Sequence, residues 1–264
     1  MTRYTVNGSI LLTELPLLER PAAVKAAGFE AAEFWWPFAV AEPSDAELDG
    51  FVAAVSDAGV ALTGLNFFAG DMPGGDRGLV SWKSRQAEFV ANIPVVVGIG
   101  ERLGCRAFNA LYGLRNDECP ADEADEIALD NLTAAAEAVK AIGGTVLLEP
   151  VSGADAYPLK TAADVIAVIE KLTERGIDNV KLLADFYHLT VNGDDVDAVI
   201  RDHTAQFGHI QIADAPGRGE PGSGSAPIAR WIADAEAAGY DGWVGLEYKS
   251  AADDPFGWLP RERR

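Results

Sequence analysis

The sequence predicts a (β/α)8 barrel that forms a single domain over residues 1–264. Apolar segments typical of buried strands alternate eight times with segments typical of amphipathic helices, and this alternation indicates a parallel sheet. No Ser/Gly-rich linker or shift in composition interrupts the series. No GxGxxG motif follows the first strand, which disfavours an open dinucleotide-binding sheet. Eight units in 264 residues, 48% of them hydrophobic, instead fit one closed barrel with a sizeable core.

The first half of the chain contains four of the expected strands, at residues 4–11, 30–35, 60–65 and 106–111. The helices expected between them span residues 13–28, 44–59 and 81–103. Ser44 is a typical N-cap, and Glu47 stands at the capping-box position three residues later. Pro94 lies inside the third of these helices and is expected to kink it.

The second half repeats the pattern, with strands expected at residues 145–149, 180–185, 207–213 and 243–247. Helices are expected at residues 121–142, 161–176, 196–204 and 228–238. Thr161 begins the second of these helices, with Leu159 placed as a hydrophobic staple. The tail after Glu247 is rich in Pro and Arg, and we expect a short surface extension there.

The composition is strongly acidic, with 41 acidic and 21 basic side chains and a net charge of −20. Such a field repels nucleic acid and anionic membrane surfaces, so neither is an expected partner. An anionic substrate would need a local metal ion, Arg or Lys. The only cysteines, Cys105 and Cys119, lack metal-site spacing, which favours a reduced, cytoplasmic protein. Neither a signal peptide nor a membrane-spanning stretch is evident.

Polar side chains follow four consecutive strands of the second half. The apolar run Thr145 to Leu148 leads directly into Glu149, and the next three strands end in Asp185, Gln211 and Glu247. Any one of these, alone, is ordinarily a hydrogen-bonded polar group at a strand end. Because the carboxyl ends of barrel strands meet at one face, where barrel active sites lie, all four are expected to converge.

Three carboxylates brought together would repel one another, and a divalent cation would remove this repulsion. A ligand set made entirely of oxygen atoms suits Mg²⁺ or Mn²⁺ better than zinc. The predicted metal ligands are therefore Glu149, Asp185, Gln211 and Glu247.

A cation flanked by two glutamates can move a proton beside a carbonyl group, because the cation acidifies the neighbouring C–H bond. Glu149 and Glu247 are the expected acid/base pair, since strands five and eight lie across the barrel from each other. One glutamate would remove the proton to give an ene-diolate, and the same or the opposing glutamate would return a proton to the adjacent carbon. Asp185 and Gln211 would then be mainly metal ligands.

Several motifs together resemble the hydroxypyruvate isomerase family of the xylose isomerase-like barrel superfamily. They are Asn7-Gly8-Ser9, Asn66 with Gly70-Asp71 and Arg77-Gly78, Leu148-Glu149-Pro150, Asp185 to His188, His209 to Asp214, Gly217 to Gly224, and Gly245 to Lys249. The resemblance covers nearly the whole chain. It implies the metal ligands and the acid/base pair given above, and interconversion of hydroxypyruvate and tartronate semialdehyde in carbohydrate or glyoxylate metabolism.

His188 matches a family position that contacts substrate oxygens, and the other expected substrate contacts are Arg218, Asn7, Asn66 and, as a weaker candidate, Lys249. The planar guanidinium of Arg218 could bind a substrate carboxylate, or it could be a solvated loop residue. His209 is expected to pack below Gln211, in support of it. Aromatic side chains that could wall the site or simply pack in the core are Trp35, Trp36 and Phe67.

The loop after strand seven departs from the family pattern, at Gly219 where members usually carry His and at Ser225 to Pro227. A 2-oxo-tetronate isomerase or a ketose 3-epimerase is therefore an alternative on the same site. Gln211 distinguishes this chain from the ketose 3-epimerases, because the similar sugar epimerases usually have His at this position. A non-catalytic sugar-acid binding protein and an apurinic-site endonuclease are more distant alternatives. Segments around Trp82 and Trp258 could form the interface of a homo-oligomer.

Overall fold

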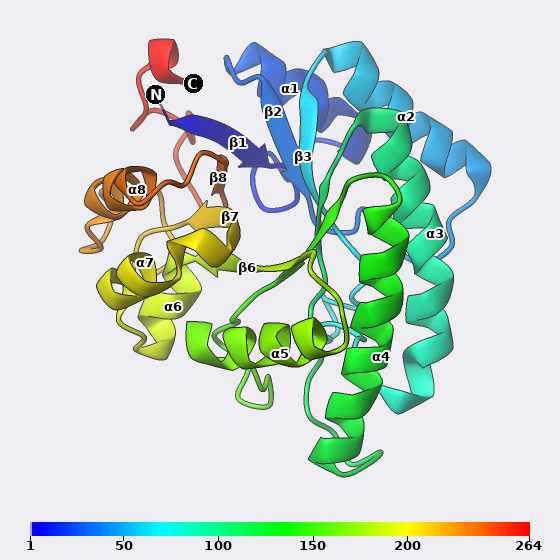
Figure 1. The fold of residues 1–264 in the computed structure, drawn as a ribbon. Helices are drawn as coiled ribbons and strands as arrows, with labels where there is room; N and C mark the ends of the chain where they lie inside the picture. The colour runs from blue at the N-terminus through cyan, green and yellow to red at the C-terminus, as the bar shows by residue number, and fades with distance from the viewer. Residues whose placement is uncertain (1) are drawn as a thin grey trace.

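The computed structural model describes residues 2–264 and confirms the predicted barrel (Figure 1). Eight parallel strands follow one another around a closed sheet, and β1 pairs with β8 to complete it. The strands are β1 (Arg3–Asn7), β2 (Ala31–Phe34), β3 (Ala61–Asn66), β4 (Ala107–Asn109), β5 (Thr145–Leu148), β6 (Val180–Asp185), β7 (Phe207–Ile212) and β8 (Trp243–Leu246).

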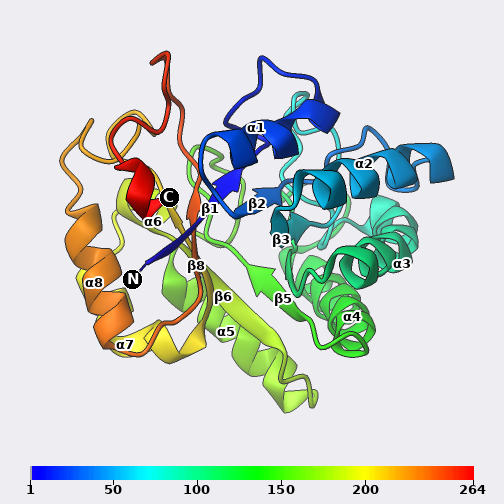
Figure 2. The same cartoon turned by 90° about the horizontal axis from the view of Figure 1, so that it is seen from above.

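The helices lie outside the sheet and cover it, as the two views show (Figures 1 and 2). They are α1 (Arg20–Ala26), α2 (Asp45–Ala58), α3 (Gln86–Leu103), α4 (Ala121–Lys140), α5 (Ala162–Glu174), α6 (Phe186–Asn192), α7 (Val196–His203) and α8 (Ile228–Ala237). Short 3-10 turns are η1 (Leu17–Glu19), η2 (Lys83–Arg85), η3 (Thr204–Gln206) and η4 (Arg261–Arg263). Among residues 2–264, no helix has both the length and the apolar character needed to cross a bilayer.

Two helices begin with the expected capping chemistry. Ser44 and Glu47 form a reciprocal capping box at the start of α2, and Thr161 and Asp164 do the same at α5. Each box satisfies backbone N–H groups that have no partner within the helix. Gly59 ends α2 in the left-handed conformation that glycine adopts without strain.

Element boundaries differ from the prediction where local polar groups redirect the chain. The first strand stops at Asn7 rather than at residue 11, because the backbone N–H groups of Ile10 and Leu11 donate back to the Asn7 carbonyl. Helix α1 begins at Arg20, directly after the 3-10 turn η1, instead of at Thr13. Helix α3 begins at Gln86, later than predicted, and contains Pro94.

A short helix, α6, was not expected after strand six. It starts directly at the end of β6, where the Asp185 carboxylate accepts hydrogen bonds from the backbone N–H groups of Tyr187 and His188. A helix of 7 residues is too short to show a clear hydrophobic period in the sequence. Its position nevertheless matters, because it fixes both Asp185 and His188 at the mouth of the barrel.

The C-terminal tail is packed against the barrel, so the expected surface extension is wrong. Phe256 and Leu259 are buried, and Phe256 lies edge-on against Phe29 with ring centroids 4.8 Å apart. The Trp258 ring meets Tyr4 of β1 in the same way at 6.0 Å. These contacts join segments more than 200 residues apart, and local patterns do not reveal them. The two chain ends consequently lie close together in both views (Figures 1 and 2).

Candidate active site

A cleft of about 1140 Å³ opens over the carboxyl ends of the strands. Of the predicted site residues, it is lined by Glu149, Glu247, His188, Arg218, Asn66 and Lys249. Asp185 and Gln211 lie beside them, paired with each other in the register of β6 and β7. The structure thus brings all four predicted metal ligands to one end of the barrel, and every one of their side chains is buried.

Glu149 follows β5 and is 5% exposed. Its Oε2 accepts a hydrogen bond of 2.7 Å from Nδ2 of Asn109, which ends β4. Burial, and then the neighbouring charge of Asp185, raises the pKa of Glu149 to about 8, although the Asn109 hydrogen bond opposes this shift. A carboxyl group that titrates near neutrality can both accept and return a proton.

His188 lies between the two acidic side chains of β5 and β6. Its Nε2 is 3.7 Å from Glu149 Oε1 and 3.6 Å from Asp185 Oδ2. The backbone N–H of Ser152 donates to His188 Nδ1 over 3.0 Å, so in the neutral ring the proton resides on Nε2. Burial lowers the pKa of His188 to about 4, which keeps the ring neutral at physiological pH.

Gln211 ends an inward-facing row on β7 and is oriented by a residue that the sequence analysis did not select. Its Nε2 donates over 2.7 Å to Oε1 of Glu33, which lies on β2 and is 2% exposed. The other Glu33 oxygen is 2.6 Å from Nε2 of His209. His209 therefore sits below Gln211, as predicted, and its partner there is Glu33.

Glu247 follows β8 and is contacted by a cation and an amide. Arg218 Nη2 donates to Glu247 Oε1, and Asn7 Nδ2 donates to Glu247 Oε2 over 3.1 Å. The Arg218 guanidinium also lies 3.9 Å from Asp185 Oδ2 and 5.4 Å above the centre of the Tyr187 ring. Burial raises the pKa of Glu247 well above its usual range, against the lowering influence of Arg218.

Two of the predicted ligands carry a buried oxygen atom that has no hydrogen-bond partner among residues 2–264. They are Asp185 Oδ2 and Gln211 Oε1, and Asn109 Oδ1 beside Glu149 is also unpaired. Buried polar atoms are otherwise almost always paired, because an unpaired one costs about 1–3 kcal/mol. Ligand atoms of Glu149, Asp185 and His188 also lie within 4.8 Å of one another. The donor set therefore fits a divalent cation, with His188 as a further nearby group.

The loop after β7 that carries Arg218 is organised by Asp214. The Asp214 carboxylate accepts three backbone hydrogen bonds, from Ala215, Gly222 and Ala226. Arg218 itself adopts a left-handed conformation with φ of 59°, which costs a non-glycine residue about 1–2 kcal/mol. The loop thus fixes the backbone from which Arg218 reaches Glu247.

The other predicted substrate contacts differ in their surroundings. Asn7 is buried, and its Nδ2 bridges Glu33 Oε1 and Glu247 Oε2 at 3.1 Å each, so that it contacts carboxylates rather than open space. Lys249 is exposed at the rim of the cleft. Trp35 and Trp36 line the cleft, whereas Phe67 packs in the core against Phe89 and Phe108.

The residues missed by the sequence analysis are Glu33 and, as a partner of Glu149, Asn109. Glu33 interrupts the apolar run Ala31 to Phe34 near the end of its strand, which is the same kind of signal that identified Glu149. The pairing of Asn7 with Glu33 in the parallel register would have placed both in one layer.

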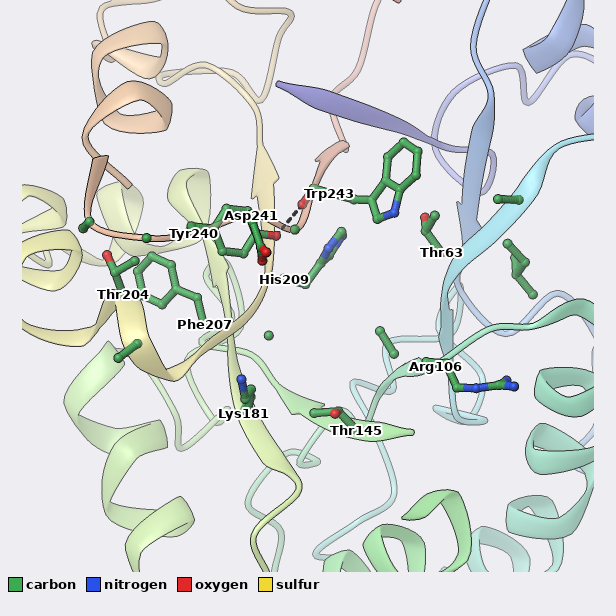
Figure 3. Close-up of a pocket in the computed structure, with 18 of the residues that line it drawn as sticks. Thr63, Arg106, Thr145, Lys181, Thr204, Phe207, His209, Tyr240, Asp241 and Trp243 are labelled. Carbon is green, nitrogen blue, oxygen red and sulfur yellow. Dashed lines mark hydrogen bonds between the residues drawn. The ribbon is translucent and has the colours of Figure 1, made fainter. Parts of the chain in front are cut away.

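A second hollow, of about 620 Å³, lies at the opposite end of the barrel. Figure 3 shows its lining, which includes Thr145 of β5, Lys181 of β6 and His209 of β7. The described residues give no ion pair for Lys181. In barrels of this type the amino-terminal face serves stability rather than chemistry, so we place the active site in the larger cleft.

Comparisons with known proteins agree with this architecture. A family model described as "Xylose isomerase-like TIM barrel" matches residues 21–263. The chain belongs to the xylose isomerase-like TIM barrel family. Among members with assigned names, a Streptomyces coelicolor protein named "Putative hydroxypyruvate isomerase" is 50% identical, with 99% of this chain and 97% of the relative covered. A Cupriavidus necator protein named "2-oxo-tetronate isomerase" is 33% identical, with 98% of both chains covered.

A solved structure shows the same fold. A Brucella melitensis crystal structure titled "AP endonuclease, family 2" superposes with a TM-score of 0.89 at 26% identity, with 100% of both chains covered. The resemblance to hydroxypyruvate isomerases is thus confirmed, and so is the prediction that the chain is an isomerase, because relatives so named match it over almost its full length.

Proposed function

We propose that this xylose isomerase-like barrel is a metal-dependent isomerase that interconverts hydroxypyruvate and tartronate semialdehyde. The observation that carries the proposal is the convergence of buried Glu149, Asp185, Gln211 and Glu247 at one end of the barrel, with two unpaired buried oxygens. The full-length match to relatives named as hydroxypyruvate isomerases supports the choice of substrate. We expect the enzyme to act in the cytoplasm.

These four side chains would hold Mg²⁺ or Mn²⁺, because every donor is an oxygen atom. The cation, when bound, would polarise the substrate carbonyl and hydroxyl oxygens and so acidify the adjacent C–H bond. Asn109 and Asn7 orient Glu149 and Glu247 by hydrogen bonds from the neighbouring strands.

Proton transfer is assigned to Glu149 and Glu247. One glutamate takes a proton from C3 of hydroxypyruvate, which leaves an ene-diolate across C2 and C3. A glutamate then delivers a proton to C2, while the hydroxyl proton moves from O3 to O2, and tartronate semialdehyde results. In the metal-free protein burial raises the pKa of both carboxyl groups, that of Glu149 to about 8, which favours groups that can hold a proton.

Arg218 is assigned to the substrate carboxylate. Its side chain lies at the cleft beside Glu247, and its planar fork matches a carboxylate better than a lysine ammonium does. In a chain of net charge −20, this local cation would offset repulsion of an anionic substrate. We expect Arg218→Lys to raise KM for 2-oxo acids by roughly tenfold or more, since hydrogen bonds to charged groups contribute ~1.5–3 kcal/mol.

The size of the cleft keeps longer substrates in consideration. At about 1140 Å³ it exceeds the ~300–1,000 Å³ typical of sites for drug-sized ligands. A 2-oxo-tetronate or a free ketose would therefore fit beside the same acid/base pair. Comparing kcat/KM for hydroxypyruvate, 2-oxo-tetronates and neutral ketoses, with wild type and Arg218→Lys, separates these substrates. Neutral ketoses should lose less kcat/KM than 2-oxo acids, because for them the substitution alters only the contact between Arg218 and Glu247.

Isotope exchange tests the reaction itself. Metal-loaded protein incubated with hydroxypyruvate in deuterated water should incorporate deuterium at C3 of the recovered substrate. Absence of exchange in protein shown to contain metal would overturn the assigned proton transfer. Cleavage of DNA containing apurinic sites is the second activity to assay, because of the structural relative from Brucella melitensis. We expect no cleavage, since the acidic surface disfavours phosphate backbones.

A further inference from the structure

We propose that Glu33 is a positioning residue that turns the amide of Gln211 so that its oxygen, rather than its nitrogen, faces the metal site. This inference rests on the proposed function, because it assigns a role to a neighbour of one proposed metal ligand. Glu33 belongs to β2, on the half of the barrel that supplies none of the four ligands.

The hydrogen bonds of Glu33 define the orientation of Gln211. Glu33 Oε1 accepts from Gln211 Nε2 over 2.7 Å. A carboxylate has no proton to donate, so only the NH₂ end of the amide can face it. The amide oxygen of Gln211 must then point away from Glu33, where it is buried without a partner among the described residues.

The alternative orientation would remove an oxygen ligand. If the amide turned over, Gln211 Oε1 would meet the Glu33 carboxylate, and the NH₂ group, which cannot bind a cation, would face the metal site. An amide carbonyl is a neutral ligand and carries no charge that would itself favour the correct orientation. The orientation of a glutamine ligand therefore depends on a neighbouring hydrogen-bond acceptor, whereas a carboxylate presents an oxygen atom in either orientation.

The barrel interior leaves room for the Glu33 carboxylate. A Cβ atom placed on Gly245 of β8 would lie 2.7 and 2.8 Å from the two Glu33 oxygens, which is too close for a real contact. A Cβ atom on Gly64 of β3 would approach the Cβ atom of Glu33 to 3.3 Å. A side chain at Gly245 would therefore force the Glu33 carboxylate to move, whereas one at Gly64 would press only against the stem of Glu33.

Two further contacts fix the Glu33 carboxylate in place. His209 lies 2.6 Å from Oε2 and occupies the oxygen that does not contact Gln211. Asn7 Nδ2 donates to Glu33 Oε1 over 3.1 Å and to Glu247 Oε2 over 3.1 Å. Asn7 therefore links Glu33 to a second proposed ligand. Glu33 thus contacts one proposed ligand directly and another through a single amide.

Affinity for Mn²⁺ is the readout that separates this role from a merely structural one. Free Mn²⁺ is measured by electron paramagnetic resonance during titration of wild type and Glu33→Gln, in the absence of substrate. Glu33→Gln keeps one acceptor oxygen but adds an NH₂ group that can face Gln211 Oε1, so both orientations of the Gln211 amide become possible. Because loss of an outer partner typically weakens metal binding ~10–100-fold, we expect a weakening at the lower end of this range. Glu33→Asp, which retracts the carboxylate by one methylene, should behave similarly and provides a second variant if Glu33→Gln is insoluble.

A double-mutant cycle tests whether Glu33 acts through Gln211. In a Gln211→Ala background, Glu33→Gln should change the Mn²⁺ dissociation constant much less than it does in the wild-type chain. An equal effect in both backgrounds would overturn the inference, and so would unchanged affinity in Glu33→Gln.

The control is Asp164→Asn, because Asp164 Oδ2 also accepts three hydrogen bonds, but at the start of α5. Its Mn²⁺ affinity should equal that of wild type. If wild type itself binds no Mn²⁺, the metal-dependent function fails and this inference fails with it. If wild type binds Mn²⁺ and Glu33→Gln binds it equally well, only the role of Glu33 is lost.

Discussion

The two halves of the barrel contribute differently to the site. Strands β5 to β8 end in the groups assigned to metal binding and proton transfer, namely Glu149, Asp185, Gln211 and Glu247. Strands β1 to β4 end in polar groups that mostly contact those side chains, namely Asn7, Glu33, Asn66 and Asn109. Reactive groups and their partners therefore come from opposite halves of one symmetric scaffold. Glu149 and Glu247 each accept a hydrogen bond from an asparagine of the first half, whereas Asp185 is held by backbone N–H groups of the second half.

Substitution of the glutamates of the second half should have the largest effect. Glu149→Gln and Glu247→Gln keep the side-chain shape but remove the ability to accept a proton. Because general acid/base catalysis contributes ~10²–10⁴-fold, we expect kcat to fall by at least this factor for each variant. Turnover of hydroxypyruvate and of a 2-oxo-tetronate is the measurement. Wild-type turnover in either variant would mean that its glutamate does not transfer the proton.

Substitution of a partner in the first half should have a smaller effect. Asn109→Ala removes the 2.7 Å hydrogen bond to Glu149 and leaves the carboxylate free to rotate. We expect metal affinity to fall by ~10–100-fold, as is typical when a ligand loses its outer partner. Isothermal titration with Mn²⁺ measures this change. A loss of activity as large as that of Glu149→Gln would contradict the distinction between the two halves.

Much of this division could be predicted from the sequence, but only for the second half. Glu149, Asp185, Gln211 and Glu247 each stand at or near the end of a short, mostly apolar strand, so their position at strand ends is visible locally. The role of Glu33 depends on a register shift beside it in the β2–β3 pair and on space left by Gly64 and Gly245. These features arise from distant strands, and no local pattern encodes them.

The absence of distant contacts from local sequence patterns also explains why helix α6 and the packing of the C-terminal tail were not predicted. Helix α6 depends on a cap from Asp185, which the sequence analysis assigned only to the metal. Burial of Phe256 depends on Phe29, at the other end of the chain. Period and composition correctly gave the closed barrel, because they report which faces are apolar. They do not report which distant side chains meet.

The acidic groups of the second half should also make stability depend on pH. In metal-free protein, burial favours protonated Glu149, with a pKa near 8 against a usual value of 4.5. This preference stabilises the fold fully below pH 4.5 and is lost as the pH rises through about 8. His188 has the opposite sign, since its neutral form is favoured and its stabilising contribution is lost as the pH falls from 6.5 through about 4.

The two contributions oppose each other between pH 4.5 and 6.5, so the clearest window lies between 6.5 and 8. There the free energy of unfolding should fall with rising pH, by up to ~1.4 kcal/mol per unit for one group. Urea unfolding after EDTA treatment measures the slope, and Glu149→Gln should reduce it, with a remainder from Glu247, whose pKa burial also raises. An equally steep slope in that variant would show that another group is responsible.

The smallest effect is expected at the opposite end of the barrel. Lys181 lies on the same strand as Asp185 but lines the amino-terminal hollow. Lys181→Met should leave kcat/KM within about twofold of wild type, because that face contributes to stability rather than chemistry. The kinetic assay above is the measurement. A tenfold loss would show that chemistry is not confined to one end of the barrel.

The attachment of the loop after β7 has a consequence for engineering. Asp214 accepts three backbone hydrogen bonds from this loop, and these do not depend on which side chains the loop carries. The remaining positions of residues 215–226 could therefore be varied together, provided that Arg218, which contacts Glu247, and Gly222 and Gly224 are retained. Libraries that vary this loop and retain Asp214 would alter substrate preference. The catalytic groups on the strands would not need to be redesigned.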